Sequence, residues 1–266
     1  MVSGFQERER DVEKSKVEEA ATLFLEAKHA VAFTGTGHST PSGIPDFRSP
    51  GSGLWTQVNP EEVASIEAFH RDPEAWYAWY HQRGTMFLNA QPNPAHYALA
   101  ELEEMGLLKA VITQNIDGLH QKAGSKRVIE LHGSSRQAVC LNCGDLIPAA
   151  LLWERYVQER QAPRCQRCGG MMKPNVILFG EMLPEEALNA AWEEAQLCDL
   201  MLIAGTSLEV IPAAHLPLVA HRSGAKLVMV NFQPTRADGY SEVVIPDDVA
   251  KVLPEVADIC RKARAS

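Results

Sequence analysis

Short apolar segments that end in glycine or polar residues recur along this chain, and they constrain its fold most strongly. Five of them are predicted β-strands, at residues 30–33, 110–112, 128–131, 200–204 and 227–230. Segments with helical character alternate with the strands, near residues 16–29, 93–105, 184–197 and 212–223. This alternation is typical of an α/β fold with a parallel sheet covered by helices.

Polar side chains follow several of the predicted strands. Directly after the segment 110–112 come Gln114, Asn115 and Asp117, and small or polar residues also follow the strands at 128–131, 200–204 and 227–230. In open α/β sheets, ligands bind outside the carboxyl ends of the strands, so these groups should converge on a small molecule. For the first run alone, a capped turn into the next helix is an equal alternative, because Asn and Asp favour such turns.

The composition narrows the class of protein. The chain has 266 residues, of which 45% are hydrophobic, enough for one large domain that carries an insertion. A net charge of −9 and a pI near 5.5 argue against a broad nucleic-acid surface. No segment reaches the roughly 18 apolar residues of a membrane span, and the N-terminus lacks the apolar core of a signal peptide. We therefore expect a cytoplasmic protein with no membrane or direct nucleic-acid partner.

Four of the six cysteines form two Cys-x-x-Cys pairs. These are Cys140 with Cys143 and Cys165 with Cys168. About 21 residues (144–164) separate the pairs, just above the roughly 15 to 20 of a zinc ribbon, and Gly144 and Gly169 supply the turns that such knuckles need. Four thiolates leave no open position, so the zinc should be structural. Disulfides are the alternative that a reducing compartment disfavours.

A glycine-rich loop follows the first predicted strand. Its sequence is Gly35-Thr36-Gly37-His38-Ser39. A strand followed by Gly-x-Gly can open a dinucleotide-binding turn, where the backbone approaches a pyrophosphate at a helix N-terminus. However, Thr40 stands where the third glycine of the usual fingerprint falls, and no clear ribose-binding acid follows about 20 residues on. A plain tight turn explains the loop equally well.

Two stretches interrupt the α/β rhythm. Residues 41–92 are rich in Pro, Gly and aromatic residues, and residues 134–178 contain the paired cysteines. We interpret both as insertions that build a smaller second lobe. A second substrate should bind in the cleft between the lobes, since domain interfaces favour such sites.

Many motifs occur together in the order typical of one family. They are Gly35-Thr36-Gly37-His38-Ser39, Ser42-Gly43-Ile44-Pro45-Asp46-Phe47-Arg48, Thr113-Gln114-Asn115-Ile116-Asp117, His132-Gly133, the four cysteines, Phe179-Gly180-Glu181 and Gly205-Thr206-Ser207. From about residue 15 to 260 the chain resembles the sirtuins, which are NAD-dependent protein deacylases. The resemblance implies a Rossmann-like NAD-binding domain made of residues 1–49, 93–133 and 179–266. It also implies a small zinc-binding lobe made of residues 50–92 and 134–178, with NAD and an acyl-lysine protein or peptide enclosed between the two.

The resemblance also implies a set of NAD contacts. The set comprises Gly35, Thr36, Gly37, Asp46, Phe47, Arg48, Gln114, Asn115, Ile116, Asp117, Gly205, Thr206, Ser207, Asn231, Phe232, Gln233 and Val249. Within it, the loop glycines would approach the phosphates, Gln114 would hold ribose hydroxyls and the Asp117 carboxylate would accept from the nicotinamide carboxamide. Residues 205–207 and 231–233 would hold the adenosine half.

Catalytic roles carry over to two residues. His132 would be the general base, because an imidazole with a pKa near 6.5 suits proton removal from a ribose hydroxyl at neutral pH. Asn115 would position a water near the reacting centre. The family reaction passes the acyl group from lysine to ADP-ribose and releases nicotinamide, and apolar lids around Phe47 and Phe179 would keep out bulk water. Without the resemblance, His132 could equally be a core histidine.

The chain departs from the usual sirtuin motif Gly-Ala-Gly-Ile-Ser at two positions, Thr36 and His38. Thr36 adds a β-branched side chain where the backbone must approach phosphate, and such residues adapt poorly to unusual backbone angles. Its hydroxyl could instead donate to a phosphate oxygen. His38 is interpreted as a structural or loop residue.

A further motif concerns the acyl group. Tyr80 and Arg83 have Tyr-x-x-Arg spacing, and Ala64 precedes them. This resembles the desuccinylase-type sirtuins, in which a small residue widens the acyl pocket and the Tyr and Arg hold a terminal carboxylate. Residues three apart share a helix face, so both could grip one succinyl or malonyl group. Alternatively, Arg83 is a solvated surface charge and Tyr80 packs in the lobe. Phe179 and Gly180 complete the predicted substrate contacts.

The leading hypothesis is an NAD-dependent lysine deacylase that accepts succinyl, malonyl or acetyl groups and needs NAD and zinc. A plain deacetylase and a mono-ADP-ribosyltransferase are the enzymatic alternatives. A non-catalytic NAD-binding module belongs to another class, and the presence of both His132 and Asn115 speaks against it. A dehydrogenase would have to reduce the nicotinamide instead of releasing it.

Overall fold

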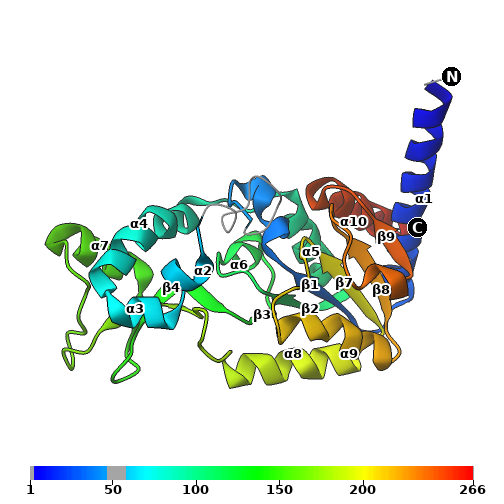
Figure 1. Ribbon diagram of the computed structural model, residues 1–266. Coiled ribbons are helices and arrows are strands. Elements are labelled where there is room, and N and C mark those ends of the chain that lie inside the picture. Colours follow the sequence, from blue (N-terminus) through cyan, green and yellow to red (C-terminus); the bar gives the residue numbers. More distant parts are fainter. Residues whose placement is uncertain (1–2, 47–57, 266) are drawn as a thin grey trace.

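The computed structural model describes residues 3–46 and 58–265, without the side chains of residues 3–13, 82, 83, 85 and 88 (Figure 1). The α-helices are α1 (Ser3–Glu26), α2 (Pro60–Val63), α3 (Ile66–Arg71), α4 (Pro73–Asn89), α5 (Pro94–Glu104), α6 (Leu119–Ala123), α7 (Ala149–Glu159), α8 (Glu185–Leu197), α9 (Leu216–Arg222) and α10 (Val249–Ala265). The strands are β1 (Ala30–Thr34), β2 (Leu108–Thr113), β3 (Val128–Glu130), β4 (Gly133–Cys140), β5 (Leu146–Pro148), β6 (Met172–Val176), β7 (Leu200–Ala204), β8 (Lys226–Val230) and β9 (Val243–Ile245).

Six strands form one parallel sheet in the order β3-β2-β1-β7-β8-β9. Strand β1 lies at its centre, and Phe33 pairs with Ile112 on one side and Ile203 on the other. The chain continues from β1 to β2 on one side and returns to β7 on the other. This reversal places a crevice at the carboxyl ends of these three strands, where Rossmann-like sheets bind their ligands.

Both faces of the large sheet are covered by helices, as Figure 1 shows. Ala30 and Ala32 of β1 face a core shared with α1, α5 and α10. Val31 and Phe33 face a second core shared with α8 and α9. Because alternate residues of a strand point to opposite faces, a strand covered on both sides must be apolar throughout. This explains the continuous apolar segments of the sequence and confirms the predicted α/β class.

A second, smaller sheet has the antiparallel order β5-β4-β6. It packs with α3, α4 and α7 around an aromatic core that includes Phe69, Trp76, Tyr77 and Trp153. Tyr77 also donates a hydrogen bond to the carbonyl oxygen of Met172 in β6, over 2.9 Å. These elements come from the two stretches that interrupt the α/β rhythm. The division of the whole chain into domains at the residue boundaries given above stays a prediction.

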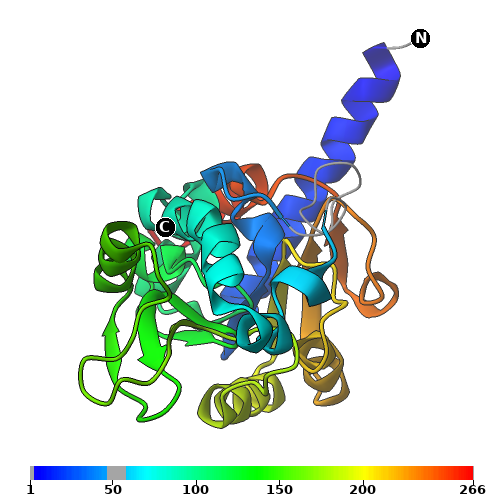
Figure 2. The same ribbon diagram turned by 60° about the vertical axis from the view of Figure 1, so that its left-hand side comes forward.

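Helix α1 begins earlier than the periodicity of residues 16–29 predicts. Its last turns pack in the core through Val17, Ala20 and Phe24, whereas its first turns project away from the body of the molecule (Figures 1 and 2). A strand that the sequence did not indicate, β9, extends the sheet beside β8. Across the part of the chain that the structure describes, no helix is both long and apolar enough to traverse a bilayer.

The loops that follow β1 and β7 touch each other with no room for side chains. The Gly37 N–H donates to the Gly205 carbonyl oxygen over 2.8 Å, and the Gly35 N–H donates to the Ala204 carbonyl oxygen over 3.2 Å. Gly205 has a φ of +63°, and a Cβ atom there would lie 2.5 Å from the carbonyl carbon of Gly37. Only glycine fits both this conformation and this contact.

We predict that Gly205→Ala lowers the free energy of unfolding by about 3 to 5 kcal/mol, because backbone strain and overlap with the facing loop add together. Urea unfolding measures this loss. Gly106→Ala is the matched control, since Gly106 has a similar φ of +73° but open space around its Cβ position, and it should lose only about 1 to 2 kcal/mol. Equal losses in the two variants would contradict the contact.

Candidate active site and metal centre

A cavity of about 770 Å³ opens at the carboxyl ends of β1, β2 and β7. Its volume lies within the roughly 300 to 1,000 Å³ of small-molecule pockets. The structure brings these predicted site residues to its walls: Gly35, Thr36, Ala64, Tyr80, Gln114, Asn115, Ile116, Asp117, His132, Phe179, Gly180, Thr206 and Ser207. The contribution of each to binding stays a prediction, but their convergence follows from the topology.

The cavity has an apolar wall that the sequence did not indicate. It is formed by Ile44, Met86, Phe87, Val176, Leu178, Leu183, Leu188, Val210 and Ile211, among others. These residues come from α4, β6, the start of α8 and the segments that follow β1, β6 and β7. No local motif marks them, because their shared position arises only when the two sheets pack together. The wall places apolar side chains beside the polar groups of the cavity.

A buried hydroxyl connects two of the predicted site residues. Ser39 donates a hydrogen bond to Asp117 Oδ2 over 2.7 Å and accepts one from Asn115 Nδ2 over 3.0 Å. Asn115 Nδ2 also donates to the Gly35 carbonyl oxygen over 2.9 Å. The Asn115 Oδ1 atom is buried and has no hydrogen-bond partner among the described residues. Because a buried acceptor is normally satisfied, this oxygen is available to a ligand or water in the cavity.

The Asp117 carboxyl group is almost fully buried beneath the cavity. Burial raises the pKa of Asp117, while hydrogen bonds from the Leu119 N–H and the Ser39 hydroxyl act in the opposite direction. Ser39 is the last residue of the glycine-rich motif, but the sequence alone assigned it no role. Its partners, Asn115 and Asp117, lie 76 and 78 positions away in the chain, so only the folded structure shows the network.

The tautomer of His132 follows from its hydrogen bond to the loop after β2. Its Nδ1 lies 2.9 Å from the Gln114 carbonyl oxygen, which can only accept, so Nδ1 carries the proton. In the neutral ring, Nε2 is then the basic nitrogen. The Gln114 side chain donates in turn to Thr206 Oγ1 over 2.8 Å, which joins the loop after β2 to the loop after β7.

The backbone of the glycine-rich loop differs from the expectation. Thr36 begins the short 3-10 helix η1 (Thr36–His38), and among the described non-glycine residues only Arg160 and Leu208 have a positive φ. Thr36 therefore needs no unusual backbone angle. Contacts with the loop after β7, and not a bound ligand, already require glycine at positions 35 and 37. A Cβ atom at Gly35, for example, would lie 2.7 Å from Thr206 Cβ.

Other predicted NAD contacts do not line the cavity, and their roles stay predictions. Gly37 and Gly205 contact each other behind it, and Asp46 is half-buried just before the undescribed segment. The run 231–233 follows β8, where the Phe232 ring is 65% exposed. Val249 is the first residue of α10, and its side chain packs in the core. Phe47 and Arg48 lie outside the described residues.

The predicted acyl-pocket residues lie on one side of the cavity. Tyr80 is buried between two rings, with centroids 4.6 Å from Trp76 and 5.7 Å from Trp153. Its hydroxyl is buried without a hydrogen-bond partner among the described residues. Ala64 lies at the rim, where its carbonyl oxygen accepts from the Phe179 N–H over 3.0 Å. Arg83 belongs to α4, but its side chain lies outside the described residues.

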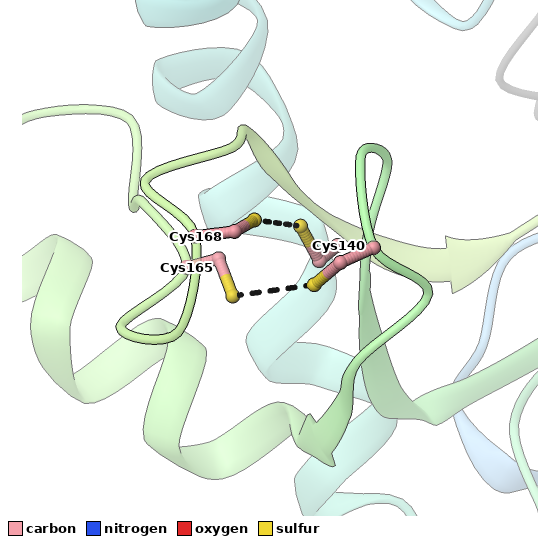
Figure 3. Close-up of side chains that lie close together, drawn as sticks. Cys140, Cys165 and Cys168 are labelled. Atoms are coloured by element: carbon pink, nitrogen blue, oxygen red, sulfur yellow. Dashed lines mark hydrogen bonds between the residues drawn. The ribbon is translucent and has the colours of Figure 1, made fainter.

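The four paired cysteines meet at one point of the small lobe (Figure 3). Cys140 Sγ lies 3.5 Å from Cys168 Sγ, and Cys143 Sγ lies 3.9 Å from Cys165 Sγ. A tetrahedral ion with Zn–S distances of about 2.3 Å separates its sulfurs by roughly 3.8 Å, so the donor set fits zinc. A zinc ion held by these four sulfurs would join the β4–β5 turn to the loop before β6.

The surroundings of Cys168 suit a thiolate. The Asn142 amide and the Gly170 N–H donate to Cys168 Sγ and lower the pKa of that thiol to about 6. Each Cys-x-x-Cys pair closes with a turn, in which the N–H of Gly144 or Gly169 donates to the carbonyl oxygen of the first cysteine. Both glycines have a positive φ, as the sequence predicts.

The model of the Sir2 family matches residues 35–212, which span the glycine-rich loop, the cysteine cluster and the loop after β7. The chain belongs to the Sir2 family. This confirms the resemblance to sirtuins. It also confirms the Rossmann-like fold, since solved Sir2 structures superimpose on most of the chain.

Individual Sir2 relatives cover nearly the whole chain. NAD-dependent protein deacylase 2 of Archaeoglobus fulgidus is 47% identical over 95% of this chain and 99% of its own length. A solved structure of a Sir2 enzyme is 46% identical, with a TM-score of 0.84, over 94% of this chain and 100% of that one. A Sir2 protein solved with a p53 peptide and NAD⁺ is 40% identical, with a TM-score of 0.82, over 92% and 97%.

We predict that replacing Cys140 and Cys143 by Ser abolishes thiolate-bound metal and unfolds the small lobe, because two oxygens cannot replace the soft ligands of the site. The near-ultraviolet charge-transfer bands of the cobalt-substituted protein measure thiolate coordination. Replacing Cys198 and Cys260 by Ala is the matched control, since these buried thiols lie in other cores. Bands of equal intensity in both double variants would contradict the four-thiolate site.

Proposed function

We propose that the chain is an NAD-dependent protein-lysine deacylase, which transfers the acyl group to ADP-ribose and releases nicotinamide. One observation carries the proposal: a basic imidazole nitrogen, fixed by the Gln114 carbonyl group, shares a cavity with the Asn115–Ser39–Asp117 network. The printed activity of the Archaeoglobus relative, an NAD-dependent protein deacylase, supports the same function.

The cavity has the groups that a dinucleotide needs. When bound, NAD supplies an electrophilic ribose carbon, a nicotinamide leaving group and the ADP-ribose that accepts the acyl group. Asn115 Oδ1 is an unsatisfied acceptor, Asp117 offers a second one, and the Thr36 hydroxyl can donate to an anionic oxygen. The complex of a 40% identical Sir2 protein with NAD⁺ supports this assignment.

The proposed general base is His132. Its Nδ1 proton is held by the Gln114 carbonyl oxygen, so Nε2 can take a proton from a ribose hydroxyl in the cavity. The same hydrogen bond orients the ring and stabilises the imidazolium that forms. Gln114 therefore acts through both its backbone, which orients His132, and its side chain, which contacts Thr206.

The apolar wall suits this chemistry because bulk water would compete with the acyl oxygen for the activated ribose. Phe179 lies on the cavity at a junction where its N–H and carbonyl group bond to the backbone of Ala64 and Ile66. We propose that an acyl-lysine peptide enters along this rim. A Sir2 relative solved with a p53 peptide supports a peptide partner.

We further propose that the acyl pocket prefers succinyl or malonyl groups over acetyl groups. The support is that Tyr80 and the small residue Ala64 line the cavity, and that the buried Tyr80 hydroxyl has no partner among the described residues. A carboxylate would satisfy that hydroxyl, and Arg83 stands one turn further along α4. A plain deacetylase leaves the hydroxyl unexplained.

The proposed setting of the protein follows from its composition. Thiolate ligands and free thiols suit a reducing compartment, so we propose a cytoplasmic location. The net charge of −9 supports the proposal that protein substrates, and not nucleic acids or anionic membranes, are its partners. We also propose that residues 50–92 and 134–178 act as the substrate-binding lobe.

We predict that His132→Ala lowers the rate of deacylation by about 10² to 10⁴-fold while NAD affinity changes little, because only proton transfer is lost. Nicotinamide release and peptide mass, followed with acetyl- and succinyl-lysine peptides, measure the rate. The control is His221→Ala, which alters an exposed histidine at the end of α9. Full activity of the His132 variant would exclude it as the base.

We predict that Arg83→Met lowers the ratio of desuccinylation to deacetylation by about tenfold to a hundredfold, because a charged hydrogen bond contributes about 1.5 to 3 kcal/mol. Paired kcat/KM values on matched peptides give the ratio. Arg71→Met, at the exposed end of α3, is the control and should leave the ratio unchanged. An unchanged ratio in both variants would leave the deacylase intact but refute the acidic acyl pocket.

A further inference from the structure

Three histidines form a buried cluster behind the active site. They come from separate elements: His38 ends η1, His96 lies in the first turn of α5, and His120 lies in α6. Their exposed fractions are 0%, 0% and 1%, and their ring centroids are 4.6 to 5.0 Å apart. None of the three lines the 770 Å³ cavity, and the cysteine cluster involves other elements.

The hydrogen bonds around His120 determine which of its nitrogens carries a lone pair. The Thr34 hydroxyl donates its only proton to Thr113 Oγ1, over 2.8 Å. It can therefore only accept from His120 Nε2, which lies 3.0 Å away. In the neutral ring, Nδ1 of His120 then presents a lone pair. That nitrogen is buried and has no partner among the described residues.

His38 is the least satisfied polar side chain of the cluster. Both of its ring nitrogens are buried without a hydrogen-bond partner among the described residues. Burial lowers the pKa of His38 and that of His120, and the neighbouring imidazoles lower the pKa of His38 further. Both rings are thus neutral at physiological pH, which is the form that binds metals.

His96 offers the third nitrogen of the cluster. Its Nδ1 accepts from the Asn93 N–H over 3.3 Å, and its Nε2 lies 3.5 Å from Ser39 Oγ. Both contacts are long, so neither holds the ring strongly. Coordination through Nε2 would move the ring proton to Nδ1 and replace the contact with Asn93. Losing the long hydrogen bond from Asn93 costs little free energy compared with the free energy that imidazoles gain by binding a transition metal.

We propose that His38, His96 and His120 form a second metal site, which takes a divalent first-row transition ion such as Zn²⁺. One donor atom from each ring lies within 4.8 Å of the others. Zn–N distances of about 2.0 to 2.1 Å place tetrahedral nitrogens roughly 3.4 Å apart, so modest side-chain rotations close the site. Three neutral imidazoles select zinc, copper or nickel over magnesium or calcium.

A metal accounts for the cluster better than hydrogen bonding within it. A direct bond between His38 and His120 would satisfy one nitrogen of each ring but leave the second nitrogen of His38 unpaired. His38 stands where the usual sirtuin motif has isoleucine, so this position adds an imidazole to the cluster. Ser39 follows His38 and bonds to Asp117, so an ion here lies one residue away from the network of the active site.

The metal content of the full-length protein tests the proposal. The purified chain is equilibrated with excess Zn²⁺, freed of loosely bound metal by gel filtration and measured by atomic emission. We expect about two zinc ions per chain, of which the four thiolates hold one. His38→Ile should lower the content to about one, whereas His215→Gln, which alters an exposed histidine, should leave it at about two.

A spectroscopic measurement distinguishes the two sites. Co²⁺ added to protein that already holds one zinc should give visible d–d bands without thiolate charge-transfer bands, and His120→Gln, as a second ligand variant, should abolish them. One zinc ion per wild-type chain would overturn the proposal. So would two zinc ions in folded His38→Ile, or d–d bands that persist in both ligand variants. The thiolate site and the deacylase function would stand in each case.

Discussion

The close contact between the loops after β1 and β7 is the constraint on which the rest of the site depends. Gly37 and Gly205 meet backbone to backbone, which brings the two loops together at the point where the strand order of the parallel sheet reverses. Thr36 then stands at the cavity on one side of the contact, and Thr206 on the other. A side chain at either glycine would push the loops apart and separate the groups that line the cavity.

From this contact the polar network extends inward. Ser39 lies two residues beyond Gly37, and its hydroxyl group sets the positions of Asn115 and Asp117. Gln114 connects the same loop to Thr206 and orients His132. Each of these side chains is fixed by a group from a different strand end. The geometry of the site therefore depends on the register of β1, β2 and β7 more than on any local motif.

The sequence predicts the parts of this structure that local patterns determine. Apolar runs marked five of the six strands of the large sheet because both faces of that sheet are buried, and the cysteine spacing predicted the thiolate cluster because each pair lies in one turn. The role of Ser39, the apolar wall and the histidine cluster could not be predicted. They arise from residues of separate elements, whose proximity is set by packing. Strand β9, of three residues, was also not predicted.

The chain alternates between the two large cores and the aromatic core. The large cores contain Phe33, Leu99, Ile129 and later residues from 191 onward, whereas the aromatic core contains residues 68–80 and 138–178. The chain thus passes between them four times. The sequence that builds the large cores, and the sequence that builds the aromatic core, are each interrupted by the other. Neither can be exchanged as one contiguous segment by a single recombination event. New acyl specificities in such a molecule must arise through point substitutions or through changes in the length of the two inserted stretches, residues 41–92 and 134–178.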